Sequence, residues 1–394
     1  MRVLYLTHRV PYAPNRGDRI RAYHTLRYLR TSGIPVCLVA LAHNHVEMAE
    51  AARLTNLVDA VHVVPVTRAR NMLKAGLLLP TDRPLTHVLL DSAKMRSVLK
   101  RVCREWRPDV VLAYCSGMAR FAMESPLDGL PFILDMVDVD SFKWEALADQ
   151  GSGPRRWIYH REARVLRRFE VEATRAARAT LVVSQREGDA LQSLDASAVP
   201  VVLPNGIDIE AFRNTGLPSA APEVVFTGVF SYQPNEEGAL WLIDHVWPRL
   251  RSSHSNAHMT LVGMGPSSNL RRRAILAGVE VTGRVSDVRP YLWRAAVAVA
   301  PLDTARGVQN KVLEAVAAGL PAVVTPAVFE GLPDVVRPAC RVARGATAFA
   351  NEIRDLLCLS GQDRRGLASR ASIEALTWEN SLAPLGGILA RVRG

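Results

Sequence analysis

The chain has 394 residues, of which 48% are hydrophobic and 22% are charged, a composition that is typical of globular proteins and argues against intrinsic disorder. The length favours two domains, each large enough to bury a core of its own. The net charge of +11 predicts an anionic partner, which could be nucleic acid, lipid headgroups or a phosphorylated substrate.

Short apolar runs alternate with longer helical patterns along the whole chain. In the first half they lie at 2–6, 35–41, 59–64, 109–114, 131–135, 179–183 and 200–203. Strands that alternate with helices predict a parallel sheet that is covered on both faces. No apolar run is long enough to span a bilayer and the first residues lack a signal-peptide pattern, so we expect a cytoplasmic protein.

The loop that follows the first apolar run, YAPNRGDRIRAYHT, is rich in arginine. Gly17 could let the backbone approach a ligand, while Arg16, Arg19 and Arg21 crowd the same place. Two interpretations stay open, namely that the arginines hold an anionic group or that they are solvated on an exposed loop. A dinucleotide fingerprint is excluded because the loop has only one glycine.

Three aspartates follow the fifth apolar run, in the stretch LDMVDVDSFKW. The carboxyl ends of parallel strands form the edge at which such sheets bind ligands, so Asp135, Asp138 or Asp140 could orient a substrate hydroxyl or accept its proton. We assign this catalytic role to Asp138. Capping of the next helix is the competing role, above all for Asp140.

Residues 154–178 form a basic segment with eight arginines and three glutamates, interleaved with apolar residues. One interpretation is an amphipathic helix that lies on an anionic membrane surface. The other is a solvated helix whose apolar residues pack on the first domain. The segment has no stacking platform or recognition motif for nucleic acid, so we expect no nucleic-acid partner.

A Pro-, Ser- and Ala-rich stretch at 216–223 separates the first series of apolar runs from a second. The second series lies at 224–228, 258–263, 279–283, 296–301, 321–325 and 340–343. We therefore expect two doubly wound, Rossmann-like α/β domains that face a central cleft, over residues 1–215 and 224–375. Residues 376–394 are expected to form a helix that packs back on the first domain.

The stretch ARGVQNKVLEAVAAGLPAVVT, residues 305–325, combines a loop, a short helix and a strand. Gly307 frees the backbone before the helix, Asn310 could cap it and Gly319 suits its C-terminal end. The helix start together with Lys311 suits a phosphate group, and Glu314 lies one turn deeper on the same side. The alternative is that Lys311 and Glu314 are only a solvated pair of opposite charges.

Several of these motifs together resemble a known family. VLPNGIDIEAF, VFTGVFSYQPN, LVGMGP, VTGRVSDVRPYL and GVQNKVLEAVAAGLPAVVT occur in the order and approximate spacing of the C-terminal domain of family 4 retaining glycosyltransferases, which have the GT-B fold. GDRIRAYHTLRYLRTSG and DMVDVDSFKW resemble the bacterial exopolysaccharide-associated sugar transferase subgroup. The resemblance covers nearly the whole chain.

The resemblance implies a hexosyltransferase that moves a sugar from a nucleotide-diphosphate sugar to a hydroxyl of a glycan or lipid-linked acceptor. The first domain would bind the acceptor and the second the donor, without a cofactor or a bound metal ion. Glu314 would hold the ribose hydroxyls, Lys311 and nearby amides would neutralise the diphosphate, and the backbone of Arg284 and Val285 would meet the base. The resemblance also implies a role in exopolysaccharide or other cell-surface glycan synthesis, at the inner face of the membrane.

The chain departs from the family pattern at two places. A second glutamate often precedes the first by eight positions, and here that position is Arg306, which cannot accept a hydrogen bond from a sugar hydroxyl but could pair with a carboxylate or the diphosphate. After VFTG, relatives often place an arginine and a lysine, whereas this chain has Ser231, Tyr232 and Asn235. Two other functions therefore stay open, a sugar-nucleotide epimerase and a catalytically degenerate GT-B scaffold at the membrane.

Overall fold

The structure is a computed structural model that describes residues 1–12, 17–303 and 308–393. By contacts the chain divides into two compact units, Met1–Gly206 with Trp378–Gly394, and Ile207–Thr377. Residues 207–213 belong to the second unit because Ile207 donates to the carbonyl of Leu376 and Trp293 Nε1 donates to the carbonyl of Phe212. The division thus lies before the stretch 216–223 that composition marks as a linker.

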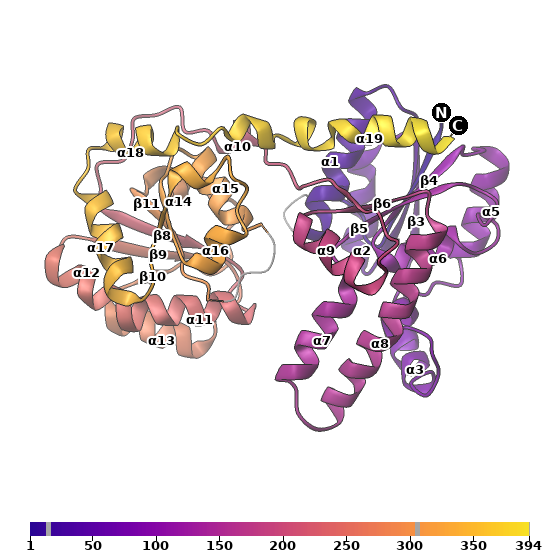
Figure 1. The fold of residues 1–394 in the computed structure, drawn as a ribbon, viewed down its shortest axis with the longest axis horizontal. Helices are drawn as coiled ribbons and strands as arrows, with labels where there is room; N and C mark the ends of the chain where they lie inside the picture. The colour runs from indigo at the N-terminus through magenta and orange to yellow at the C-terminus, as the bar shows by residue number, and fades with distance from the viewer. Residues whose placement is uncertain (13–16, 304–307, 394) are drawn as a thin grey trace. The chain divides into compact units, whose positions relative to one another are not determined.

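The first unit contains a seven-stranded sheet in which every ladder is parallel (Figure 1). Each apolar run that predicted a strand in this half forms one. The strand order is β3-β2-β1-β4-β5-β6-β7. The strands are β1 (Val3–Thr7), β2 (Val36–Ala42), β3 (Ala60–Pro65), β4 (Val110–Tyr114), β5 (Phe132–Val137), β6 (Ala179–Val182) and β7 (Val201–Val202).

Helices cover both faces of this sheet because successive strand residues point to opposite sides. Leu4 and Leu6 join one buried cluster with residues of α5, α6, α8 and α9, while Val3 and Tyr5 join another with residues of α1 and α19. The helices are α1 (Gly17–Thr31), α2 (His45–Glu50), α3 (Arg68–Leu77), α4 (Leu85–Leu89), α5 (Met95–Glu105), α6 (Ser116–Ala122), α7 (Asp140–Gln150), α8 (Gly153–Ala176), α9 (Gln185–Leu194) and α19 (Trp378–Arg393). A 3₁₀ turn, Ala51–Leu54, follows α2.

The second unit contains a six-stranded sheet, again with only parallel ladders between its strands. Its order is β10-β9-β8-β11-β12-β13, so the chain reverses its direction of winding between β8 and β11. Such a switch point is where doubly wound sheets bind ligands. The strands are β8 (Glu223–Thr227), β9 (His258–Val262), β10 (Glu280–Val281), β11 (Val297–Ala300), β12 (Ala322–Val324) and β13 (Cys340–Val342).

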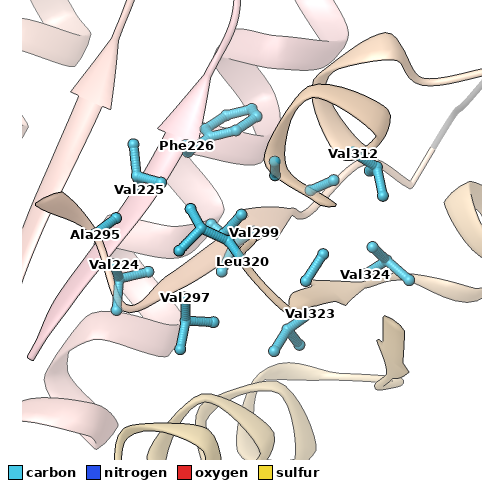
Figure 2. Packing of buried hydrophobic residues seen from close by; sticks show 14 of the residues in the cluster. Val224, Val225, Phe226, Ala295, Val297, Val299, Val312, Leu320, Val323 and Val324 are labelled. Carbon is cyan, nitrogen blue, oxygen red and sulfur yellow. The ribbon is translucent and has the colours of Figure 1, made fainter. Parts of the chain in front are cut away.

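The core of the second unit is one apolar cluster between this sheet and its helices. Figure 2 shows Val312 of α15 packed near Phe226 of β8 and Val299 of β11. The helices are α10 (Ile209–Phe212), α11 (Gln233–Trp241), α12 (Trp247–Ser253), α13 (Ser268–Ala277), α14 (Arg289–Arg294), α15 (Asn310–Ala317), α16 (Pro326–Glu330), α17 (Ala346–Leu357) and α18 (Gly361–Ala368). A π-helical segment, Leu242–Val246, joins α11 to α12, and 3₁₀ turns lie at Arg337–Ala339 and Ile373–Leu376.

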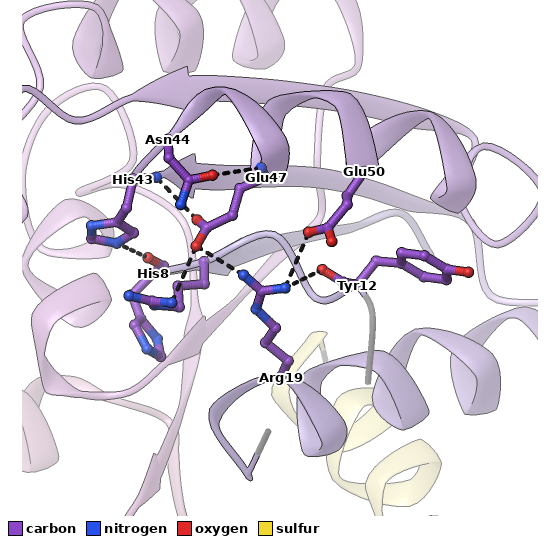
Figure 3. A network of polar contacts seen from close by, with 8 residues as sticks. His8, Tyr12, Arg19, His43, Asn44, Glu47 and Glu50 are labelled. Carbon is purple, nitrogen blue, oxygen red and sulfur yellow. Dashed lines mark hydrogen bonds and ion pairs between the residues drawn. The ribbon is translucent and has the colours of Figure 1, made fainter. Parts of the chain in front are cut away.

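The arginines after β1 are buried and bound by the protein itself, so both interpretations of Arg19 and Arg21 were wrong. Arg19 contacts Glu47 at 2.8 Å and Glu50 at 3.1 Å (Figure 3). Arg21, 1% exposed, makes two hydrogen bonds to Asp135, at 2.8 and 3.0 Å, and a third to the carbonyl of Leu203. These contacts tie α1 to the ends of β5 and β7. Arg16 lies outside the described residues.

The basic segment 154–178 forms most of α8, which packs on the first unit as the second interpretation expected. Val165 and Leu166 are buried, and Phe169 packs against the ring of His87 with 4.4 Å between ring centroids. Trp157, by contrast, is 57% exposed. In the part of the chain that the structure describes, no helix is both long and apolar enough to cross a membrane.

Candidate functional site

The loops after β8 and β9 pack tightly at the carboxyl edge of the second sheet. Gly263 has a φ of +146°, and a Cβ atom there would come within 1.8 Å of the carbonyl oxygen of Gly228. The Gly228 amide donates to the carbonyl of Val262, and the Phe230 amide donates to the carbonyl of Met264. Glycine is therefore required at 263, and this contact fixes the loop that leads into α11.

Helix α15 is the next helix along the chain after β11, and it begins beside the switch point. Asn310 is its first residue and not its cap, a position that Gln309 occupies in extended conformation without a side-chain hydrogen bond to the helix. The expected capping role of Asn310 was therefore wrong, and its Oδ1 is buried with no hydrogen-bond partner among the described residues. At the other end, Gly319 has a φ of +84° and its amide donates to Val316, as expected for a helix that ends in the left-handed conformation.

The side chain of Lys311 is half-buried in the first turn of α15 and has two defined contacts. Its Nζ donates a 2.5 Å hydrogen bond to Oδ1 of Asn235, in the first turn of α11. The same atom lies 4.7 Å from the centroid of the Phe226 ring, within range of a cation–π interaction. Lys311 thus connects the helix after β11 with the strand and the helix on the other side of the switch point.

Glu314 lies three residues after Lys311 and is also half-buried. Its carboxylate makes no hydrogen bond or ion pair with any residue of the described ranges, and Lys311 uses Asn235 as its partner. The solvated ion pair considered from the sequence is therefore not what the two side chains form. The site instead contains one directed cation and one carboxylate whose oxygens are not engaged by the described part of the protein.

Burial changes the pKa of both groups. The pKa of Lys311 is lowered to about 8 because burial disfavours the ammonium, and the charge of Glu314 opposes part of this effect. The pKa of Glu314 is raised to about 7, again because of burial, and Lys311 opposes that change. Both charged forms lack the solvation they would have in water, so a ligand that supplies anionic oxygens to one and hydroxyl groups to the other would stabilise them.

Residues 284 and 285 lie in the loop after β10. Arg284 is exposed, whereas Val285 lines a hollow of about 480 Å³ together with Ser286, Asp287, Pro290, Tyr291 and Arg294. Asp287 binds Arg289 at 2.7 Å, and Arg294 lies over the ring of Tyr291 at 4.7 Å. The hollow is therefore lined by an aromatic ring and by polar side chains.

The first unit carries the remaining candidates. Asp138 follows β5 and accepts a 2.8 Å hydrogen bond from Lys143, which also binds Asp140 at 3.1 Å. Asp140 is the first residue of α7, after its cap Val139. Asp138 is 35% exposed and so accessible to a ligand. Gly17 is the first residue of α1.

Two residues at this edge of the first sheet have unusual backbone conformations. Cys115, after β4, has a φ of +67°, and Val137, at the end of β5, has a φ of +68°. A positive φ is costly for a β-branched residue such as Val137, and such strain is concentrated at functional sites. His8, after β1, stacks on Tyr114 with 5.5 Å between ring centroids, next to Cys115.

Arg306 and Gly307 lie outside the described residues, so their predicted roles are not placed by the structure. Within residues 1–12, 17–303 and 308–393, no group of three or more His, Cys, Asp or Glu side chains is arranged to hold a metal ion.

Asn235 was not among the predicted site residues. From the sequence it is a departure from a charged position in relatives, whereas in the structure it is the partner of Lys311. One sequence feature could have identified Asn235, namely its position in the first helical turn after VFTG. The strand that ends in this motif and the strand before α15 end at the same edge of a parallel sheet. The role of Phe226 beneath Lys311 had no signal, because a phenylalanine in a buried strand is usually only part of the core.

Comparison with known families gives two matches. Residues 16–206 match the model of the glycosyl transferase 4-like domain, and residues 221–358 match that of the glycosyl transferases group 1. Together these matches cover most of both units. A comparison with curated protein sequences gives no significant match.

Several solved structures share the fold over nearly the whole chain. Anabaena Alr3699/HepE in complex with UDP and glucose has a TM-score of 0.66 at 15% identity, covering 99% of this chain and 100% of that chain. A glycosyltransferase from Rickettsia africae ESF-5 has a TM-score of 0.65 at 11% identity, with 99% and 98% covered. A variant of S. aureus TarM in complex with fondaparinux, alpha-GlcNAc-glycerol and UDP has a TM-score of 0.67 at 9% identity, with 98% and 99% covered. At these identities the likeness concerns the fold.

Proposed function

Because the chain belongs to the family 4 glycosyltransferases with the GT-B fold, we propose that it is a retaining hexosyltransferase that uses a nucleotide-diphosphate sugar. The acceptor is a hydroxyl group of a glycan or of a lipid-linked sugar. Two facts about structural relatives support this choice of substrates. HepE was solved with UDP and glucose, and TarM was solved with glycan ligands and UDP.

The observation that carries the proposal is the arrangement of Lys311, Asn235 and Glu314 at the switch point of the second sheet. During transfer the bond between the anomeric carbon and the diphosphate breaks, and negative charge grows on the departing phosphate. A lysine directed by a neutral amide at a helix N-terminus stabilises this charge. Asn235 orients Lys311 without cancelling its charge, which leaves the ammonium available to the phosphate.

Glu314 supplies the second contact with the donor. A carboxylate accepts hydrogen bonds from both hydroxyls of a ribose, and such bonds to an ionised acceptor are stronger than those to a neutral one. The raised pKa of Glu314 shows how unfavourable its charge is before a ligand provides donors. The buried Oδ1 of Asn310, which has no partner within the described ranges, offers a further acceptor one turn earlier on the same helix.

The base of the nucleotide is assigned to the loop after β10, where the backbone of Arg284 and Val285 offers hydrogen-bonding groups beside the hollow. Gly307 and Arg306 remain predicted donor contacts. Arg306 would replace the usual glutamate and add positive charge near the sugar or the diphosphate.

The acceptor is assigned to the carboxyl edge of the first sheet. Lys143 binds Oδ2 of Asp138, so the other oxygen of this half-exposed carboxylate can accept a hydrogen bond from the acceptor hydroxyl. Asp138 then orients the hydroxyl whose oxygen attacks the anomeric carbon. Gly17, at the start of α1, lets the backbone approach a ligand in the same unit.

We place the reaction in exopolysaccharide or other cell-surface glycan synthesis, in the cytoplasm and at the inner face of the membrane. The exposed arginines of α8 support contact of residues 154–178 with an anionic membrane. Val165 and Leu166 of that helix do not support it, because they face the core. No cofactor is required by this chemistry.

A panel of UDP-, GDP-, ADP- and TDP-sugars tests the proposal. We expect one nucleotide class to raise the melting temperature and to be hydrolysed slowly when no acceptor is present. Addition of the correct acceptor should accelerate release of nucleoside diphosphate and retain the anomeric configuration. Absence of binding to all donors would reject the proposal.

The same panel distinguishes the alternatives. An epimerase would convert the donor into a second sugar without dependence on an acceptor. A degenerate scaffold would bind a donor without hydrolysis or transfer. A configuration that is inverted in the product would preserve glycosyl transfer and reject only the retaining mechanism.

A further inference from the structure

Helix α3 exposes its apolar side to solvent. The exposed residues on this side include three large ones, Met72 at 57%, Leu73 at 75% and Leu77 at 81% exposed. The small residues Ala69 and Gly76 between them are also exposed. Their spacing of three and four residues places them on one face of the helix. A surface helix normally directs such a face to the core, so α3 is turned the opposite way.

Polar contacts hold α3 in this orientation. Asn71 is 3% exposed, and its side-chain amide donates to the carbonyls of Leu89 at 3.1 Å and Asp91 at 2.7 Å. Lys74 forms an ion pair with the side chain of Asp91. Rotation of the helix to bury its apolar face would break these bonds and deprive the carbonyls of Leu89 and Asp91 of the Asn71 donor. These contacts therefore fix the orientation in which α3 exposes its apolar face.

The charge around this face is positive. Residues 66–81 contain Arg68, Arg70 and Lys74 and no acidic residue, and both arginines are exposed. Asp82, the next acidic residue, already lies 3.7 Å from Arg168 of α8. A second copy of the chain that contacted this helix through its own α3 would bring no carboxylate to Arg68 or Arg70. A surface that combines exposed aliphatic side chains with unbalanced arginines complements an anionic lipid layer instead.

The next segment of chain attaches α3 to the helical hairpin of α7 and α8 (Figure 1). Arg161 of α8 donates to the carbonyls of Leu79 and Arg83, and Arg168 contacts Asp82. Trp157 precedes Arg161 by four residues and so lies on the same face of α8, one turn farther along. This exposed indole is the type of side chain that membrane–water interfaces accommodate.

We propose that α3, with Trp157 of α8, docks the protein on a membrane surface that contains anionic lipids. Leu73 and Leu77 enter the headgroup region, and Arg68 and Arg70 bind lipid phosphates. This surface shares Trp157 with the expected lipid contact along residues 154–178 but is centred on α3, because Val165 and Leu166 of that segment pack inside the unit. The proposal does not depend on the identity of the donor sugar.

Helix α13 of the second unit offers a matched control. It also combines arginines with two exposed aliphatic residues, Ile275 at 77% and Leu276 at 80% exposed. These two are adjacent in sequence and do not form a row along one face, and Arg273 is paired with Asp244. Helix α13 therefore lacks the continuous apolar face of α3.

Sedimentation of the full-length protein with phosphatidylcholine vesicles, with and without phosphatidylglycerol, tests the proposal. We expect binding only when phosphatidylglycerol is present, and a loss of at least about tenfold in affinity for Leu73→Gln/Leu77→Gln. Arg68→Gln/Arg70→Gln should weaken binding by about fivefold for each arginine and reduce its salt dependence. Ile275→Gln/Leu276→Gln should bind like the wild type.

Each other outcome overturns the proposal. The proposal is wrong if the wild type does not bind anionic vesicles. It is also wrong if the α3 and α13 variants lose binding equally, because that result would indicate a nonspecific effect of exposed aliphatic residues. Light scattering adds a separate readout, because a wild-type dimer that dissociates in Leu73→Gln/Leu77→Gln would identify a second copy as the occupant. Donor hydrolysis by every variant verifies that the chain is folded, independently of vesicle binding.

Discussion

Lys311 donates its hydrogen bond to Asn235 across the switch point of the second sheet, at 2.5 Å. Asn235 is 6% exposed, and its own amide donates to the carbonyl of Val229 at 2.9 Å, so both ends of the side-chain amide are fixed. The position of the ammonium is thus set by a neutral residue in the first turn of α11, and no carboxylate of the described residues forms an ion pair with it. This arrangement leads to the first prediction.

Asn235→Ala should lower kcat by roughly tenfold, because Lys311 loses the acceptor that orients it, and should cost about 1 kcal/mol of stability. Asn235→Asp retains an acceptor for Lys311 but brings a negative charge next to the diphosphate, so it should raise KM for the donor more than Asn235→Ala does. Steady-state kinetics with varied donor measure both values. Wild-type kcat and KM in the alanine variant would show that Asn235 does not position Lys311.

Lys311→Ala should lower kcat by about 10²- to 10³-fold, the cost of removing one group that stabilises charge in a transition state. Lys311→Arg retains a positive charge and should recover part of the rate. Lys100→Ala is a suitable control, because Lys100 is an exposed lysine on α5 in the other unit. If Lys311→Ala and Lys100→Ala have the same rate, the charge of Lys311 has no role in departure of the diphosphate.

Glu314→Gln should raise KM for the donor severely, because a neutral amide binds two ribose hydroxyls less well than a carboxylate does. The loss should be much smaller with a donor whose ribose lacks its 2′-hydroxyl, since that donor makes only one of the two bonds. Comparison of kcat/KM for both donors in both proteins measures the coupling. Equal losses with the two donors would place Glu314 away from the ribose.

The same substitution should change the dependence of stability on pH. The folded pKa of Glu314 is about 7, above its ordinary value of 4.5, so its contribution to stability is complete below pH 4.5 and is lost as the pH rises through about 7. Lys311 is protonated in both the folded and unfolded states over this range, because its lowered pKa of about 8 lies above it. The free energy of unfolding of Glu314→Gln should therefore exceed that of the wild type by about 1 to 3 kcal/mol at about pH 7, although the variant is less active. A difference at pH 7 that is smaller than the difference at pH 5, or reversed, would contradict this.

The fold followed from the sequence because each strand is a short apolar run between helical patterns, and two such series on either side of a linker favour two parallel sheets. The unit boundary did not follow from composition. Residues 207–213 look like a continuation of the first series, but hydrogen bonds to Leu376 and from Trp293 place them in the second unit. Contacts between residues far apart in the chain decided this boundary, and no local pattern reports them.

The sequence predicted those site residues that a short stretch of chain identifies. It did not predict contacts between side chains that are far apart in the chain. The Lys311 and Glu314 positions follow from a helix start near a sheet edge, whereas the contact of Lys311 with Asn235 crosses 76 residues. For Arg19 and Arg21 the local pattern misled, because an arginine-rich loop is usually exposed and here its partners are Glu47 and Asp135. Only the folded arrangement brings those carboxylates to the arginines.

The buried pair of Arg21 and Asp135 gives a prediction about stability. Asp135→Ala leaves the Arg21 guanidinium buried without its carboxylate, which should cost about 3 to 5 kcal/mol and lower the melting temperature of the first unit by about 6 to 20 °C. Glu124→Ala removes the exposed partner of Arg96 and should cost less than about 1 kcal/mol. Calorimetry of both variants compares the two pairs. Similar losses would mean that burial does not determine the importance of the Arg21 pair.

Asp138→Asn should lower the rate of transfer to the acceptor more than the rate of donor hydrolysis, because water does not need to be oriented in the same way as an acceptor hydroxyl. The expected readout is a lower ratio of transfer to hydrolysis, together with a raised KM for the acceptor. Lys143→Met removes the cation that holds Asp138 Oδ2 and should shift the ratio in the same direction by a smaller factor. Asp149→Asn, at an exposed position on α7, should leave the ratio unchanged. If transfer and hydrolysis fall equally in Asp138→Asn, the residue acts on the donor or on the fold, and the acceptor hydroxyl must be oriented by another group at this edge, such as His8.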